Sequence, residues 1–212
     1  MLKVFSNISK VEKLPANSDA TQLYIVRHGQ TDWNREQRIQ GHQDIPLNET
    51  GRKDAALVAE RMKETRLDLC VSSDLSRAYE TAQVISSGRS LTIKTDLRLR
   101  ERTFSHWEGS LFAELYNTDK SKRLGLESDD AMIVRIFACL QDIVKVYSGQ
   151  AILITTHGGV ICRILSTLLE LEDCKGFSAK NGAVLHLQHS PGGWMIRNLE
   201  GIKLPETVHS PT

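Results

Sequence analysis

The 212-residue sequence has few cysteines, little net charge and no long apolar run, and each shortage excludes a class of protein. Its four cysteines are scattered, with no C-x-x-C pair and no His/Cys cluster at metal-ligand spacing, which argues against a disulfide scaffold and against a metal centre. The net charge of +1 favours neither nucleic acid nor a membrane surface as a partner. No uninterrupted apolar stretch could cross a bilayer. We therefore expect a cytoplasmic protein with reduced thiols that uses no metal and no other cofactor.

The two ends of the chain differ from the rest in composition. Residues 1–20 are too polar and too broken for the apolar core of a signal peptide, so we expect a poorly structured leader there. Residues 204–212 are interpreted as a tail of the same kind. Between them, residues 21–203 show no internal repeat and no low-complexity stretch, which predicts a single domain with a short cap around 110–130.

Strand-like and helix-like segments alternate through this domain. The alternation predicts an α/β fold of three layers, in which a mostly parallel sheet carries helices on both faces. An antiparallel hairpin is expected to close the chain across "SPGG". Strands are predicted at 23–26, 67–73, 91–97, 151–156, 183–189 and 193–200, and helices at 47–64, 74–88, 130–149 and 160–171.

Polar side chains follow two of these strands at the point where each one ends. Arg27 and His28 come after "LYIV", and His157 comes after "AILITT"; a glycine follows each histidine. Ligands of open α/β sheets bind outside the carboxyl ends of the strands, so the two His-Gly pairs could share one pocket. We expect each glycine to let the backbone approach a ligand and to leave its N–H free to donate. Arg77, near the start of the helix after a third strand, would complete a cationic site suited to phosphate.

Five blocks of sequence together resemble the histidine phosphatase superfamily, which has the phosphoglycerate mutase-like fold. They are "RHGQTDWN", "RIQGHQDIPLNETGR", "VSSDLSRAYETA", "LRERTFSHWEG" and "THGGV", and they follow one another in the family's order. R-H-G alone would be weak support, whereas five ordered blocks are strong. The resemblance covers roughly residues 23–170.

The resemblance implies a covalent phosphohistidine mechanism that needs no metal. His28 matches the nucleophile, Arg27 and Arg77 match the phosphate-binding arginines, and Glu101 matches the proton donor. His157 matches the second histidine of the pocket. Further positions expected at the phosphate or substrate are Asn34, Gln40, Gly41, Thr31 and Gly158. The chemistry requires the same types of residue, because a phosphate monoester needs a nucleophile, fixed cations and a proton for its leaving alkoxide.

Some assignments have structural alternatives. A lone His28 would more often be a packed core histidine, but Arg27 and the second His-Gly pair favour the functional interpretation. Arg77 could instead be a surface arginine paired with Asp74 or Glu80, both within helical reach.

The carboxylate and the amides are less certain from sequence. Glu101 lies in a charged string that is typical of a solvated loop, and Glu108 is a rival carboxylate. Asn34 and Gln40 could instead bind only their own loop backbone.

The chain departs from mutase relatives around the proton donor. Thr103 stands where mutases carry histidine, Ser105 stands where glycine is common, and His106 precedes the Trp-Glu-Gly sequence. The cap is also short, whereas mutases use a long insertion rich in arginine and proline to enclose the substrate and hold its carboxylate. Excluding water lets a phosphoenzyme return its phosphate to an organic acceptor, so a small cap favours hydrolysis.

We therefore expect a phosphomonoesterase whose partner is a small phosphorylated metabolite, with no nucleic acid and no membrane. Two alternatives remain open: a phosphoglycerate mutase with a shortened cap, and a catalytically weak phosphate-binding regulatory module. A homodimer formed through the exposed faces of the last hairpin is also open.

Overall fold

The computed structural model describes residues 20–206 and 208, and a six-stranded sheet forms its centre. The predicted leader, except Ala20, and most of the predicted tail lie outside the described residues. The strands follow the order β3-β2-β4-β1-β5-β6. The strands are β1 (Thr21–Arg27), β2 (Leu69–Ser72), β3 (Ile93–Thr95), β4 (Ala151–Thr156), β5 (Ser178–Ser190) and β6 (Gly193–Lys203).

The first four strands pair in parallel, as the sequence predicts. β1 lies beside β4 and β4 lies beside β2, so all three strands end at the same edge of the sheet. β5 and β6 form the predicted antiparallel hairpin, and β5 also pairs antiparallel with β1. The hairpin strands are longer than predicted, because pairing continues beyond the alternating apolar segments.

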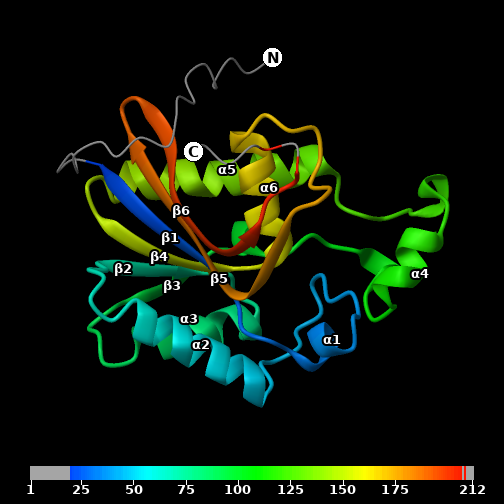
Figure 1. Ribbon diagram of the computed structural model, residues 1–212, viewed down its shortest axis with the longest axis horizontal. Helices are drawn as coiled ribbons and strands as arrows, with labels where there is room; N and C mark the ends of the chain where they lie inside the picture. The colour runs from blue at the N-terminus through cyan, green and yellow to red at the C-terminus, as the bar shows by residue number, and fades with distance from the viewer. Residues whose placement is uncertain (1–19, 207, 209–212) are drawn as a thin grey trace.

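Helices cover both faces of the sheet (Figure 1). α2 (Glu49–Arg61) and α3 (Ser76–Ser86) pack together on one face, while α5 (Asp129–Val146) and α6 (Gly158–Leu168) pack on the other. The three-layer α/β arrangement is confirmed. No helix among the described residues combines the length and apolar character needed to cross a membrane.

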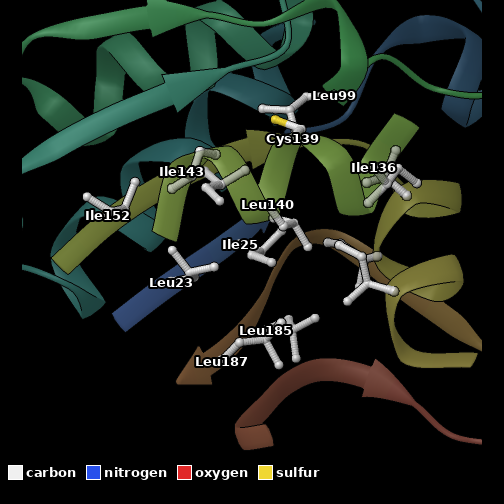
Figure 2. Close-up of a cluster of buried hydrophobic side chains, with 14 of the residues drawn as sticks. Leu23, Ile25, Leu99, Ile136, Cys139, Leu140, Ile143, Ile152, Leu185 and Leu187 are labelled. Atoms are coloured by element: carbon white, nitrogen blue, oxygen red, sulfur yellow. The ribbon is translucent and has the colours of Figure 1, made fainter. Parts of the chain in front are cut away.

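The larger core lies between the sheet and α5 and α6. Figure 2 shows Ile143 and Leu140 of α5 near Ile152 of β4 and Ile25 of β1, with Ile136 one turn earlier in the same buried cluster. These positions recur at helical spacing along α5, which is why this strongly apolar segment is a helix with one buried stripe. Burial of each such side chain contributes about 1.5–3 kcal/mol relative to full exposure. The core thus holds the strand ends at fixed positions.

Two short helices were not predicted, and both lie at the carboxyl end of β1 (Figure 1). α1 (Asp32–Arg35) and α4 (Phe112–Asn117) each span too few residues to show helical periodicity. α4 and a single 3₁₀ turn, η3 (Lys120–Lys122), make up the segment predicted as a cap. The helix after β4 also begins earlier than predicted, directly after His157.

Candidate active site

A cavity of about 280 Å³ opens at the carboxyl ends of β1 and β4. Most of the residues that the sequence singles out line it, which brings together positions up to 74 residues apart in the chain, from Arg27 to Glu101. The predicted site residues in its wall are Arg27, His28, Asn34, Gln40, Gly41, Arg77 and Glu101. Of the other predicted site residues, all within the described part of the chain, Thr31, His157 and Gly158 do not line the cavity.

His28 is a buried imidazole with its tautomer set by the main chain. Its Nδ1 lies 2.7 Å from the carbonyl oxygen of Gly29, so Nδ1 carries the proton and donates it to that oxygen. The pKa of His28 is held well below its usual value by burial, then by the nearby Arg77 and Arg27. His28 is therefore neutral near pH 7, with the lone pair on Nε2 available for attack.

His157 lies next to His28, with ring centroids 5.2 Å apart and ring planes inclined at 64°. Both of its ring nitrogens are engaged by protein groups. Arg77 Nε donates to His157 Nδ1 at 3.3 Å, and His157 Nε2 lies 2.9 Å from Ser73 Oγ. Burial lowers the pKa of His157, as do the charges of Arg77 and Arg27. In this geometry His157 accepts a hydrogen bond that fixes the position of Arg77, and its ring packs against the ring of His28.

Arg77 is fully buried in the first turn of α3 and is not a surface arginine. Its guanidinium donates to the carbonyl oxygens of Gln43 and Gly41, both at 2.8 Å. With the bond to His157, these contacts use three of its five N–H donors, and within the described residues the other two are left for a ligand. Burial lowers the pKa of Arg77 to about 10, so the side chain remains charged near pH 7.

The surface alternative for Arg77 is wrong because its two proposed partners bind other arginines. Asp74 pairs with Arg100, and Glu80 pairs with Arg52 at 2.6 Å.

Arg27 brings an unsatisfied donor to the cavity. Its NH1 donates to the carbonyl oxygen of Ala179, whereas its buried Nε has no hydrogen-bond partner among residues 20–206 and 208. A buried donor without a partner costs about 1–3 kcal/mol, which a bound anion would recover.

Glu101 is held by main-chain donors on both sides. The N–H of Gly159, in the first turn of α6, donates to Oε2 at 2.9 Å, and the N–H of Arg102 donates to Oε1 at 2.9 Å. A Cβ at position 159 would lie 2.2 Å from Glu101 Oε1, so a larger residue there would push the carboxyl out of this position. The rival Glu108 is committed to its loop, accepting from the N–H groups of His42 and Phe104.

The glycine after His28 has a different reason from the one predicted. The N–H of Gly29 is not free, since it donates to Thr81 Oγ1 at 3.2 Å. A Cβ at Gly29 would lie 2.1 Å from the carbonyl oxygen of Gly51, at the start of α2. A Cβ at Gly158 would lie 3.2 Å from Arg27 Nε. The glycines therefore permit close packing of protein against protein around the site.

Thr31 organises the two amides that line the cavity. It is the N-cap of α1, and its hydroxyl donates to Gln40 Oε1 at 3.0 Å. Asn34 Oδ1 accepts from the Thr31 N–H and from Asn181 Nδ2, both at 3.2 Å. This arrangement turns the amide nitrogen of Asn34 away from its own loop. Asn34 and Gln40 thus bind loop groups and line the cavity at the same time.

Sequence reasoning missed Asn181 on β5, which also donates to the carbonyl oxygen of His28 at 3.0 Å. It missed Arg163 and Gly159 on α6 and the aromatic rim of the cavity as well. That rim contains Phe104, Phe112 and Tyr116, with Phe112 and Tyr116 stacked at 6.2 Å. The one pattern in the sequence that could have indicated this rim is the spacing of Phe112 and Tyr116, which are four residues apart, as on one face of a helix. A single pair is too short to predict a helix.

Two of the three departures from mutase relatives, Thr103 and Ser105, shape the loop beside Glu101. Ser105 has a φ of 53°, in the left-handed region that glycine adopts without cost. Thr103 Oγ1 lies 3.4 Å from Glu108 Oε1 and accepts from the Ser105 N–H at 3.4 Å. The loop therefore keeps a backbone suited to glycine without having one.

Replacing Ser105 by glycine should stabilise the protein. Relief of the left-handed strain, less the extra entropy that glycine has in the unfolded chain, should raise the free energy of unfolding by about 0.5–1 kcal/mol. Urea unfolding of the purified variant measures this change. The matched control is Ser105→Ala, which keeps the strain; an equal gain in both variants would contradict the explanation.

Stability should fall as the pH falls below about 6.5. His28 and His157 have pKa values well below those in the unfolded chain, and burial lowers the pKa of His186 to about 4. Between these values and about 6.5, the unfolded chain binds more protons than the folded one. Each histidine should then remove up to about 1.4 kcal/mol per pH unit.

Urea unfolding between pH 7.5 and 5 measures this slope. The side chain of His186→Gln does not titrate, so the slope of the free energy of unfolding against pH should be smaller by the contribution of about one proton, up to about 1.4 kcal/mol per pH unit. A stability that is flat across this range would contradict the neutral, buried state of the histidines.

The described residues bring no three His, Cys, Asp or Glu side chains together as a metal site. The charge of the cavity comes from arginines. Together with the neutral His28 and the carboxyl of Glu101, they make a site suited to a phosphate group.

Comparisons with known proteins agree with this geometry. The family model of the histidine phosphatase superfamily (branch 1) matches residues 23–200. Phosphoglycerate mutase-like protein 4 of Arabidopsis thaliana is 41% identical over 159 residues, which cover 68% of this chain and 69% of that protein.

Two solved structures are also similar over most of their length. A mycobacterial glucosyl-3-phosphoglycerate phosphatase in complex with VO3 has a TM-score of 0.75 and 28% identity, covering 85% of this chain and 99% of that one. A phosphoserine phosphatase of Entamoeba histolytica in complex with phosphoserine has a TM-score of 0.75 and 29% identity, covering 85% and 96%. The chain belongs to the histidine phosphatase superfamily (branch 1), as a phosphoric monoester hydrolase.

Proposed function

We propose that the protein hydrolyses a small phosphorylated metabolite through a covalent phosphohistidine on His28, without a metal. The observation that carries the proposal is the neutral imidazole of His28, whose proton is held on Nδ1, in a cavity that Arg27, Arg77 and Glu101 also line. This arrangement supplies a nucleophile, fixed positive charge and a proton donor in one place.

In the first step, Nε2 of His28 attacks phosphorus and the ester P–O bond breaks. The leaving alkoxide takes a proton from Glu101, giving the alcohol and phosphohistidine. In the second step, the Glu101 carboxylate takes a proton from water, which attacks phosphorus. The P–N bond then breaks, which releases phosphate and restores the imidazole. Arg27 and Arg77 stabilise the charge on the transferring phosphoryl oxygens in both steps.

The held carboxyl of Glu101 is compatible with this role. Each of its oxygens accepts one main-chain hydrogen bond. A carboxyl oxygen has two lone pairs, so either oxygen can still carry the transferred proton. The two main-chain donors keep the group in the cavity wall while its protonation state changes.

The short cap favours hydrolysis of a phosphoenzyme over transfer of its phosphoryl group back to an organic acceptor. Among the described residues, the segment between the loop that carries Glu101 and α5 has only α4 and one 3₁₀ turn, and Tyr116 on the cavity rim is 66% exposed. Water can therefore reach a phosphoenzyme. The mutase alternative is kept because of the mutase-like relative from Arabidopsis thaliana.

One assay tests the function. The wild-type protein should release phosphate from p-nitrophenyl phosphate in the presence of a chelator. With 3-phosphoglycerate, release of inorganic phosphate should be faster than isomerisation. Isomerisation that outruns hydrolysis would make the protein a mutase, and a folded protein that turns over no monoester would leave only a binding module.

The role of Glu101 should show in the dependence on the leaving group. Glu101→Gln should slow an alkyl phosphate by about 100-fold or more, because the alkoxide needs a proton. p-Nitrophenyl phosphate should be slowed much less, because p-nitrophenolate leaves unprotonated. Comparing kcat/KM for the two substrates in wild type and variant measures this difference; equal losses would show that Glu101 is not the acid.

A reducing, cytoplasmic setting belongs to the same proposal. All four cysteines lie within the described residues and carry free thiols. Burial raises the pKa of Cys70, Cys139 and Cys162 to about 12, which keeps these thiols protonated and unreactive. The homodimer through the last hairpin stays a prediction.

A further inference from the structure

The loop that carries Glu101 depends on other elements for the hydrogen-bond partners of its main chain. Residues 100–104 belong to no helix and no strand, so their carbonyl oxygens have no regular ladder of hydrogen bonds. Carbonyl groups that are turned away from water are almost always hydrogen-bonded in native proteins. One side chain, that of Arg135 in the second turn of α5, supplies the donors for three carbonyl oxygens in and just before this loop.

The guanidinium of Arg135 uses all of its donors on protein groups. Its NH1 donates to the carbonyl oxygens of Arg98 and Arg100, both at 2.7 Å, and its NH2 donates to that of Glu101 at 3.1 Å. Its Nε and NH2 also donate to the two carboxylate oxygens of Glu127, at 2.6 and 2.7 Å. A guanidinium has five N–H donors, so none is left for a ligand. Arg135 is also not among the described residues that line the cavity.

Glu127 holds this guanidinium and the loop at the same time. It lies just before α5, and the side chains of Arg135 and Glu127 are only 19% and 14% exposed. The main-chain N–H of Glu127 donates to the carbonyl oxygen of Thr103 at 3.1 Å. A carboxylate bound by two donors of one guanidinium has a well-defined geometry. One ion pair therefore fastens the loop both before and after the position of the proposed acid.

Arg135 and the carboxyl of Glu101 bind opposite sides of one peptide unit. The carbonyl oxygen of Glu101 accepts from Arg135 NH2, and the next N–H along the chain, that of Arg102, donates to Glu101 Oε1 at 2.9 Å. The C=O and the N–H of a peptide unit lie in one rigid plane. A guanidinium that holds the C=O therefore sets the direction of the N–H that holds the carboxyl. His42 Nε2, 2.9 Å from the same carbonyl oxygen, adds a second contact to this unit.

The arginines just before Glu101 do not have this role. Arg98 pairs with Asp96 at 2.7 Å and with Asp142 of α5 at 2.6 Å. Arg100 pairs with Asp74. Within the described part of the chain, neither of these side chains forms a hydrogen bond to Glu101. Their contacts hold other side chains, whereas Arg135 holds the main chain.

We propose that Arg135, paired with Glu127, is a positioning residue for Glu101. It acts through the main chain, by fixing the peptide unit whose N–H holds the carboxyl within reach of the leaving oxygen. The inference rests on the proposed function, in which Glu101 protonates the leaving alkoxide. Proton transfer needs the two heavy atoms at hydrogen-bond distance, and a displacement of about 1 Å can cost about 100-fold in rate.

Arg135→Met should slow substrates whose leaving group needs a proton and spare those whose leaving group does not. For 3-phosphoglycerate, which releases an alkoxide, kcat/KM should fall by about tenfold or more. For p-nitrophenyl phosphate it should fall by less than about threefold. The ratio of the two kcat/KM values measures the difference, because it cancels any loss that both substrates share, including partial misfolding. A ratio equal to that of the wild type would overturn the inference.

A double variant tests whether Arg135 acts through the acid. Glu101→Gln has no carboxyl proton to deliver, so adding Arg135→Met to it should change the ratio by less than about twofold. A further fall as large as the one in the wild-type background would show that Arg135 acts independently of Glu101, which would overturn the inference.

Arg98→Met is the matched control. It removes an arginine that connects the same segment to α5, but one that does not bind the peptide unit of Glu101. Its ratio should equal that of the wild type. A fall as large as in Arg135→Met would assign the effect to a general loosening of the loop and contradict a specific role for Arg135.

Arg135→Lys decides the question if Arg135→Met does not fold. Lysine keeps the positive charge opposite Glu127, but its donors sit on a single nitrogen and cannot serve the carboxylate and three carbonyl oxygens together. The ratio should therefore fall by about threefold or more. A folded Arg135→Lys protein with the wild-type ratio would overturn the inference.

Failure of the inference differs from failure of the proposed function. If Glu101→Gln lowers the ratio and Arg135→Met does not, Glu101 remains the acid and only the positioning role is overturned. If Glu101→Gln leaves the ratio unchanged, or the wild type hydrolyses p-nitrophenyl phosphate but not 3-phosphoglycerate, the proton-donor role and the inference are both overturned. No turnover of either substrate would overturn the proposed function as a whole.

Discussion

Replacing His28 by alanine should lower kcat/KM by at least about 10⁴-fold for every phosphate monoester the protein accepts. The reason is that His28 is the only described cavity-lining residue whose neutral nitrogen nucleophile lies between Arg27, Arg77 and Glu101. Any other side chain in that wall that formed the proposed covalent intermediate would hold the phosphoryl group away from Arg27 and Arg77. Steady-state kinetics with p-nitrophenyl phosphate measures the loss.

A control is needed because His28 is buried and its removal leaves a cavity. His186→Gln changes a half-buried imidazole on β5, whose ring centroid lies 4.3 Å from that of Tyr24, three residues before Arg27, and it should retain activity. Free imidazole added to His28→Ala should restore part of the turnover. A His28→Ala protein that is folded and keeps more than about 1% of wild-type activity would show that another group is the nucleophile.

Replacing Arg77 by methionine should have the second largest effect, on activity and on stability together. Loss of a buried guanidinium that faces the transferring phosphoryl group should lower kcat/KM by about 10³-fold. The carbonyl oxygens of Gly41 and Gln43 would lose their donor, which should reduce the free energy of unfolding by about 2–3 kcal/mol.

Arg77→Met should also change the pH profile in a direction that a purely structural loss would not produce. The charge of Arg77 contributes to lowering the pKa of His28. Without it the pKa of His28 rises, so the acid limb of kcat/KM should move to higher pH. Kinetics across pH 4.5–8 measures the shift. Arg52→Met, on a surface pair of α2, is the control; an unchanged acid limb in Arg77→Met would contradict the electrostatic link.

The sequence predicted those parts of the site that follow directly from strand ends. Arg27, His28 and His157 end buried parallel strands, and parallel strands that neighbour one another end at the same edge. The apolar runs therefore predicted that these residues could share one edge, although not that β1 and β4 are neighbours. The long helices were foreseeable for a similar reason, because α5 has five turns over which its apolar stripe repeats.

Other parts depend on contacts that no local pattern records. Asn181 reaches Asn34 and His28 only because β5 runs antiparallel beside β1. Arg163 looks like any helical arginine until α5 places Asp129 beside it. Gly29 was expected to free a donor, yet it serves the close approach of Gly51, which lies 22 residues further along the chain.

The role of Glu101 shows the same division. Its sequence neighbours are charged and indicated a solvated loop, whereas the fold places its carboxyl against the first turn of α6. Only the family resemblance distinguished it from Glu108 before the structure was known. The structure separates the two carboxylates by location. Glu108 accepts hydrogen bonds from N–H groups of its own loop region, whereas Glu101 lies in the cavity wall.

The central claim is a phosphoryl group bonded to Nε2 of His28 during turnover. Rapid mixing with excess substrate, quenching in base, where phosphohistidine survives, and peptide mass spectrometry test it most directly. We expect one phosphorylated peptide, the one that contains His28, and none from His28→Ala. Wild-type protein that turns over substrate in the same mixing experiment but carries its phosphoryl group on another residue, or on none, would contradict the account.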